Sequence, residues 1–338
     1  MSLSRPRARL TVDGQTLTSA QAGLVRLTVG LSLSGSHDSA EVTVWPSSRL
    51  AATAAGAAMS IALGDEGKER DVWTGEVTAV AAGPDAVVLD GLAATAALSR
   101  RRTSQSYLDR SVADIVNDLA GGAAIDEVAG DTGLPVFAVD DRRPVWEHLK
   151  ELARLVGADL GASPAGALRF VPAKAGAADW RLRFGADVLS WSGGPALSPE
   201  PPAIAAYGAA SEAGAEQWHW LLRSPTPAAG GAGGAGIGGA AGAGAGAGAL
   251  RVLAALRTRD AAAGMAQALS RRAARAAFAG RMTVVGRPEV RPGDLIEVSG
   301  LPSGDPGTLR VRALTHRLDA RHGFVTTLAV EAAGGGLP

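Results

Sequence analysis

The sequence contains no cysteine in its 338 residues. This absence excludes a disulfide framework, a thiol nucleophile and any metal site built on thiolates. Aromatic residues are also scarce, at 4% of the chain. A carbohydrate-binding β-module needs exposed aromatic rings on one face, so this scarcity counts against one without excluding it.

Neither sign of charge is in excess, because Lys and Arg total 33 and Asp and Glu also total 33. A chain without net charge has no long-range field to concentrate nucleic acid or an anionic membrane. No run of about 18 apolar residues is present, and the N-terminus MSLSRPRARL lacks the apolar region of a signal peptide. We therefore expect no nucleic-acid partner, no membrane insertion by this chain, and assembly in the cytoplasm.

Glycine, in contrast, is abundant, with 45 residues, and many of them lie in a Gly/Ala tract over 228–249. Such a tract lacks the side chains needed for a core, so we expect a flexible insertion. It contains a G-x-G-x-x-G pattern at Gly231, Gly233 and Gly236. A dinucleotide site needs an apolar strand before that pattern, and Pro and Ser precede it here, so we reject this interpretation.

Short alternating segments predict that residues 8–92 form a β-barrel or sandwich. The clearest strands are expected at 24–33, 40–45, 72–80 and 86–90. A similar meander is expected near the C-terminus, over 291–330, after the turn Arg291-Pro292-Gly293-Asp294. The order of strands and turns in 60–91 repeats in 293–330, and we align 73–80 with 309–316. Two related barrels are one interpretation, although meanders are common.

Residues 101–180 have a different pattern, which predicts an α+β insert. Ser111 and Asp114 form a capping box before an amphipathic helix that ends at Gly121. A second helix is expected from Pro144 to Gly157, and a hairpin follows it over 158–171. We also expect a long helix over 250–278. Its basic cluster of Arg271, Arg272 and Arg275 is either a solvated face or a partner contact.

No group of residues forms a recognisable catalytic pattern. The five histidines are dispersed, at His37, His148, His219, His316 and His322. Glu147, His148 and Glu151 lack the order of a zinc helix. Asp140–Asp141 and Asp109/Asp114 are candidate carboxylate pairs for glycoside cleavage, and His316 is a candidate base. We predict that Asp114 caps a helix and that His316 is a strand-paired, partly buried side chain. We name no catalytic, cofactor-binding or metal-binding residue and expect no cofactor.

An ordered set of motifs resembles the phage late-control protein D family, the baseplate hub proteins of contractile tails and injection systems. The matching positions are Pro292-Gly293-Asp294, Val311, His316, Gly323-Phe324 with Thr326, and the helix pattern of Trp146, Leu149, Leu152, Ala153 and Gly157. The resemblance implies a mainly β chain with an α/β insert: two related β-barrels, a small α+β domain and a long helix. It places the first barrel at 1–100, the insert at 101–180, and the second barrel at 181–227 and 250–334.

The resemblance also implies an architectural function rather than an enzymatic one. Three copies would form a pseudo-six-fold ring that joins the inner tube or a tube-initiator protein above to a separate spike protein below. Other baseplate proteins would surround the ring within a phage-tail-like particle. The hub part of type VI secretion spikes is related. A tail-associated cell-wall-degrading enzyme and a carbohydrate-binding β-module are the alternatives.

Overall fold

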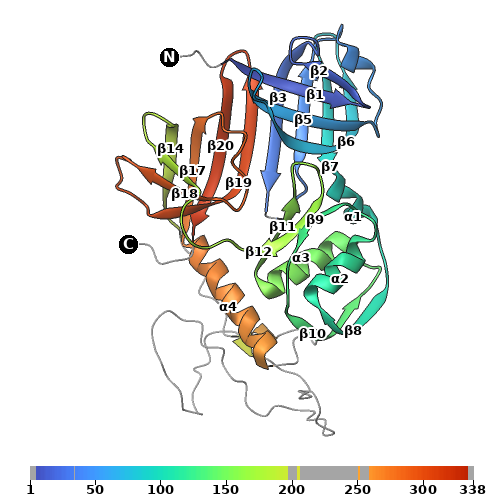
Figure 1. The fold of residues 1–338 in the computed structure, drawn as a ribbon, viewed down its shortest axis with the longest axis vertical. Coiled ribbons are helices and arrows are strands. Elements are labelled where there is room, and N and C mark those ends of the chain that lie inside the picture. The colour runs from blue at the N-terminus through green and yellow to red at the C-terminus, as the bar shows by residue number, and fades with distance from the viewer. Residues whose placement is uncertain (1–4, 34, 197–203, 206–249, 252–258, 334–338) are drawn as a thin grey trace.

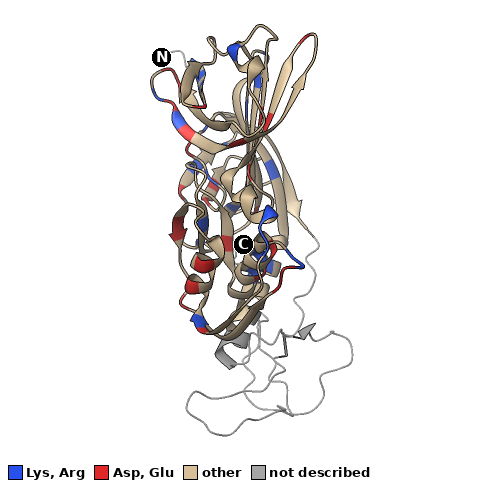
Figure 2. Cartoon of the chain, turned by 90° about the vertical axis from the view of Figure 1, so that its right-hand side faces the viewer, with Lys and Arg blue, Asp and Glu red and all other residues tan. Residues whose placement is uncertain are grey.

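The computed structural model describes residues 5–33, 35–196, 204–205, 250–251 and 259–333 (Figure 1). Thirteen of the described strands form one curled, mainly antiparallel sheet, and a small α+β part packs beside it (Figures 1 and 2). The strand order is β14-β17-β20-β19-β3-β4-β7-β6-β5-β1-β2, and β18 and β13 branch from β19. The predicted Gly/Ala insertion at 228–249 lies outside the described residues. No helix in the described part of the chain is long and apolar enough to cross a membrane.

The first half of the sheet comes from the N-terminal part of the chain, in blue in Figure 1. Alternating apolar residues turn one face of each strand into the core, as predicted. Its elements are β1 Pro6–Val12, β2 Gln15–Thr18, β3 Leu24–Ser32, β4 Ser39–Val44, the 3-10 turn Arg49–Ala52, β5 Ala58–Asp65, β6 Arg70–Ala82 and β7 Val87–Ala93.

The α+β part follows, and its local signals are those read from the sequence. Ser111 Oγ accepts from the N–H of Asp114 at the start of α2, and Gly121 ends that helix in the left-handed conformation. Gly157 ends α3 in the same way. Its elements are a 3-10 turn at Ala94–Ala96, α1 Ala97–Arg100, β8 Gln105–Ser111, α2 Val112–Ala120, β9 Ile125–Val128, β10 Gly133–Val139, α3 Val145–Val156, β11 Ala158–Ala162 and β12 Leu168–Pro172.

The second half of the sheet closes the chain, and a helix is inserted between two of its strands. Its elements are β13 Trp180–Arg183, β14 Val188–Pro195, β15 Ile204–Ala205, β16 Leu250–Arg251, α4 Arg259–Ala276, β17 Phe278–Val285, β18 Leu295–Ser299, β19 Thr308–Asp319 and β20 Gly323–Ala332. The helix predicted over 250–278 is therefore too long, because both of its ends are strands. Strand pairing competes with helix formation there and overrides the helical preference of Ala and Arg.

The two halves have the same strand order. The first runs β3-β4-β7-β6-β5-β1, and the second runs β14-β17-β20-β19-β18-β13. They also share two register shifts. At the first shift, Thr78 of β6 and its equivalent Arg312 of β19 have no partner in the ladder. At the second, the unpaired residues are Val25 of β3 and its equivalent Leu189 of β14. One difference is the direction of the last strand, since β1 is antiparallel to β5 but β13 is parallel to β18.

These pairings correct the alignment proposed from sequence. Val77 lies opposite Gly91, as Val311 lies opposite Val330, so β6 and β19 align two residues away from the predicted 73–80 with 309–316. The echo itself was recognised correctly. The offset was missed because a shift of two residues leaves the alternation of inward and outward side chains unchanged.

One joint connects the halves, since β19 of the second pairs antiparallel with β3 of the first from Ala313↔Ser32 to Asp319↔Arg26. The described strands of the two halves thus make one continuous sheet, and separate closure into two barrels stays a prediction. A single core cluster extends across both halves. Trp73 is 1% exposed, as expected of a core residue, whereas Phe324 is only partly buried against that core.

Candidate functional site

The turn from Arg291 to Asp294 connects the two halves through hydrogen bonds. Arg291 Nη1 donates to the carbonyl of Val72 at 3.1 Å, and Nη2 donates to the carbonyl of Asp71 at 2.7 Å. The Arg291 backbone N–H donates to Asp294 Oδ2 at 2.9 Å, which closes the turn. Trp180 Nε1 donates to the same oxygen at 2.8 Å. The motif that carried the family resemblance therefore binds the second half to β6 of the first.

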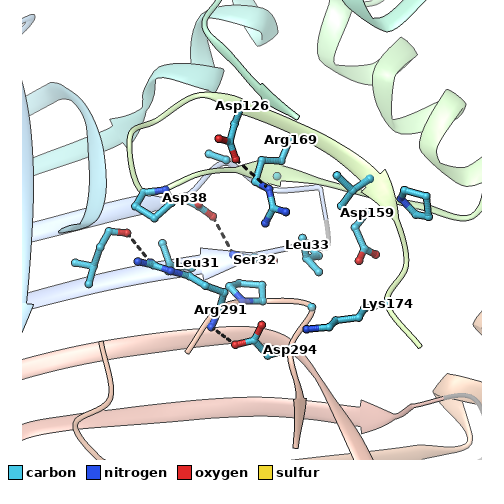
Figure 3. A pocket seen from close by; sticks show the side chains of 18 residues that line it. Leu31, Ser32, Leu33, Asp38, Asp126, Asp159, Arg169, Lys174, Arg291 and Asp294 are labelled. Carbon is cyan, nitrogen blue, oxygen red and sulfur yellow. Dashed lines mark hydrogen bonds and ion pairs between the residues drawn. The ribbon is translucent and has the colours of Figure 1, made fainter. Parts of the chain in front are cut away.

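Beside this turn lies a cavity of about 190 Å³, lined by residues of both halves and of the α+β part (Figure 3). Asp38 lies in its wall and accepts a hydrogen bond from the Ser32 N–H at 2.9 Å. Burial raises the pKa of Asp38 to about 7, although the Ser32 N–H and the charge of Arg291 act in the opposite direction. Asp38 thus changes its charge near neutral pH at the point where the three parts meet.

A second polar contact ties the α+β part to the second half of the sheet. Arg310, on β19, is 3% exposed and contacts Asp159 of β11 at 2.5 Å and Glu331 of β20 at 2.8 Å. Burial disfavours its charge, but the two carboxylates outweigh burial and raise the pKa of Arg310. Arg275 of α4 lies near this group, and burial and the charge of Arg310 lower its pKa. One member of the predicted basic cluster is thus part of an internal network.

A third contact joins the α+β part to the first half and was missed by sequence reasoning. His37 lies with its Nδ1 3.2 Å from Thr95 Oγ1 and its Nε2 2.6 Å from Ser99 Oγ. Its ring is 4.4 Å from the ring of Trp146, whose Nε1 donates to the carbonyl of Gly35 at 2.8 Å. These residues are far apart in sequence, and no local pattern marks them as neighbours.

His316, the candidate base, and His148 are both buried. His316 is fully buried, more than predicted, and its Nδ1 lies 2.9 Å from Thr326 Oγ1. Burial lowers its pKa to about 3, so its ring is neutral and inaccessible to a substrate. His148 is also fully buried, with Nε2 3.0 Å from the carbonyl of Asp140. The hydrogen bond of His316 joins β19 to β20, and that of His148 joins α3 to the segment that precedes it.

The two candidate carboxylate pairs are on the surface and outside the cavity wall. Asp140 forms an ion pair with Arg142 at 3.0 Å, and the hydrogen bond from Arg142 lowers its pKa, which does not suit a proton donor. Asp109 is exposed, with φ of 48°. Asp114 lies in the first turn of α2, as predicted. In the described residues no group of three His, Asp or Glu side chains could hold a metal ion.

No family model matches the sequence, and no curated protein matches it. Solved structures, in contrast, match the fold of this chain. A tail protein from Neisseria meningitidis superposes with a TM-score of 0.70 at 15% identity, over 96% of each chain. A prophage tail protein from Shewanella oneidensis gives 0.66 at 14% identity, over 97% of this chain and 98% of that one. The fold is that of phage tail proteins.

The same fold extends beyond phage. An E. coli protein described as a component of the type VI secretion system superposes with a TM-score of 0.60 at 12% identity, over 97% of this chain and 79% of that one. All three similarities span nearly the whole chain, including both halves of the sheet and the α+β part between them. At such identities they establish the architecture, and the narrower late-control protein D family stays a prediction.

Proposed function

We propose that this chain is the structural hub of a phage-tail or injection-system baseplate, and that three copies form a ring between an inner tube and a central spike. The fold of tail and secretion-system proteins supports this proposal. The observation that carries it is the repeat of strand order and bulge positions in the two halves of the sheet. Three copies of a duplicated chain present six similar units around one axis.

A ring of this kind resolves a symmetry mismatch. A partner with six-fold symmetry can contact all six half-sheets in nearly the same way, while a trimeric partner contacts three complete chains. The polar contacts described above support this role, because they fix the two halves and the α+β part relative to one another. The expected partners are a tube or tube-initiator protein, a spike protein and the surrounding baseplate proteins.

Light scattering on the purified protein, alone and mixed with the expected spike and tube partners, tests the proposal. We expect a mass three times the 33.9 kDa of one chain, and rings with a central opening in electron micrographs. A protein that stays monomeric with these partners at all concentrations would contradict the hub function.

A further inference from the structure

The repeat shows which strand edges should have partners. In the second half, β19 uses one side for two neighbours: Thr308–Arg310 pair with β18, and Ala313–Asp319 pair with β3. In the first half, β6 holds the place of β19 and pairs with β5 only as far as Glu76. Beyond the bulge at Thr78, the β6 arm (Ala79–Ala82) has no neighbour on that side within the described strands.

A matching edge lies at the other end of the sheet. In the repeat, β14 is the equivalent of β3. β3 has a neighbouring strand on both sides, whereas β14 pairs only with β17 among the described strands, so its other edge has no partner strand there. Isolated edge strands usually carry charges that prevent pairing with another chain. β14 has the sequence VLSWSGGP, without any charge, and its Leu189 is 56% exposed. The nearby edge strand β13, in contrast, carries Arg181 and Arg183.

We propose that β14 of one copy pairs antiparallel with the β6 arm of the next copy, and so repeats the internal joint between β3 and β19. This inference rests on the proposed ring and names its subunit contact. The two edges are different surfaces of the chain, so the contact is head-to-tail, the type of contact from which a closed ring can be built. Three internal joints would alternate with three joints between copies.

The internal joint also predicts the register. Thr315 lies opposite Gly30 and Ala313 lies opposite Ser32, which places Ala81 opposite Gly194 and Ala79 opposite Ala196 of the next copy. Small side chains favour close approach here, since the β6 arm is three-quarters alanine and a side-chain carbon added at Gly194 would meet nothing within 4 Å. Pro195 can accept a backbone hydrogen bond but cannot donate one, so the joint is weakest at that residue.

Because the chain has no cysteine, a disulfide can test the register directly. The Leu33 N–H donates to the carbonyl of Arg312, and by the alternation of an antiparallel ladder Thr315 and Gly30 are a non-hydrogen-bonded pair. Such pairs have the closest side chains and suit a disulfide. The double variant Ala81→Cys/Gly194→Cys should therefore form bonds between copies after mild oxidation. On a non-reducing gel we expect the monomer band to be replaced by covalent dimers and trimers.

Two matched variants make the result specific. Gly30→Cys/Thr315→Cys places the same pair at the internal joint, and should lose its free thiols while staying a monomer on the gel. Ala79→Cys/Gly194→Cys is displaced by two residues, and should remain mainly monomeric on the gel.

Three results would overturn the inference. If light scattering shows a wild-type trimer but Ala81→Cys/Gly194→Cys gives no bond between copies, the ring stands and this contact is wrong. If the displaced pair links equally well, the register is wrong. If the wild-type protein is monomeric at every concentration and no variant links copies, the proposed function fails as well.

Discussion

Replacing Arg310 by methionine should destabilise the protein more than any change at an exposed ion pair. Arg310 is 4% exposed at its side chain, and its partners Asp159 and Glu331 are 12% and 17% exposed. Methionine fills the space but leaves two carboxylates without their cation. Removing one partner of a buried ion pair costs about 3–5 kcal/mol. The free energy of unfolding should fall by that amount, measured by urea denaturation with tryptophan fluorescence.

Arg181 provides the matched control. It also pairs with a glutamate across two strands, Glu297 at 3.1 Å, but the two side chains are 82% and 46% exposed. An exposed pair contributes about 0–1 kcal/mol, so Arg181→Met should have little effect. The triple variant Arg310→Met/Asp159→Leu/Glu331→Met should recover part of the lost stability, because the two carboxylates are removed together with their cation, while Arg275 loses the nearby charges of Asp159 and Glu331. A small effect of Arg310→Met alone, equal to that of Arg181→Met, would refute this reasoning.

Three further predictions concern other parts of the chain. Burial raises the pKa of Asp38 from 3.8 to about 7, so its contribution to stability is complete below the lower value and is lost as the pH rises to the higher one. Asp38→Asn, which keeps an acceptor for the Ser32 N–H, should flatten the fall in stability measured between these two pH values. Trp73→Ala should cost about 3–5 kcal/mol and accelerate hydrogen exchange in the first half, whereas Phe324→Ala should cost less because this ring is only partly buried. Replacing 228–249 by a short Gly/Ser linker should leave Tm within a few degrees, since Gly and Ala can bury too little side chain to offset roughly 1–2 kcal/mol of ordering per residue. A large fall in Tm would contradict this.

Features set by neighbours in sequence could be predicted from the sequence. The cap at Ser111, the left-handed glycines after two helices and the hairpin of β11 and β12 depend on a few adjacent residues. The repeat of the meander could also be recognised, because each copy keeps its alternation and its turns. These signals together were sufficient to predict the mainly β architecture.

Features set by distant pairing could not be predicted. Arg310 and Asp159 are 151 residues apart in sequence. A charged residue can equally well lie on the surface, so neither residue type reveals that the two form a buried ion pair. The joint between β3 and β19 leaves no local mark, because a strand paired on two sides and an edge strand can share the same alternation. The start of α4 was also misjudged, since Ala-rich sequence favours a helix wherever tertiary pairing does not override it.

The two ends of the sheet differ in a way that fits the proposed ring. At one end, the short turn between β3 and β4 carries Asp38, and the equivalent connection between β14 and β17 carries the insertion with α4. The halves therefore differ most where α4 and the α+β part lie, at the bottom of Figure 1. At the opposite end, Trp45 and Val285, directly after the paired Val44 and Val284, are 55% and 47% exposed. In a ring of three copies, the first end would have three-fold symmetry, as a trimeric spike requires. The second would repeat an apolar position six times, which suits a six-fold tube.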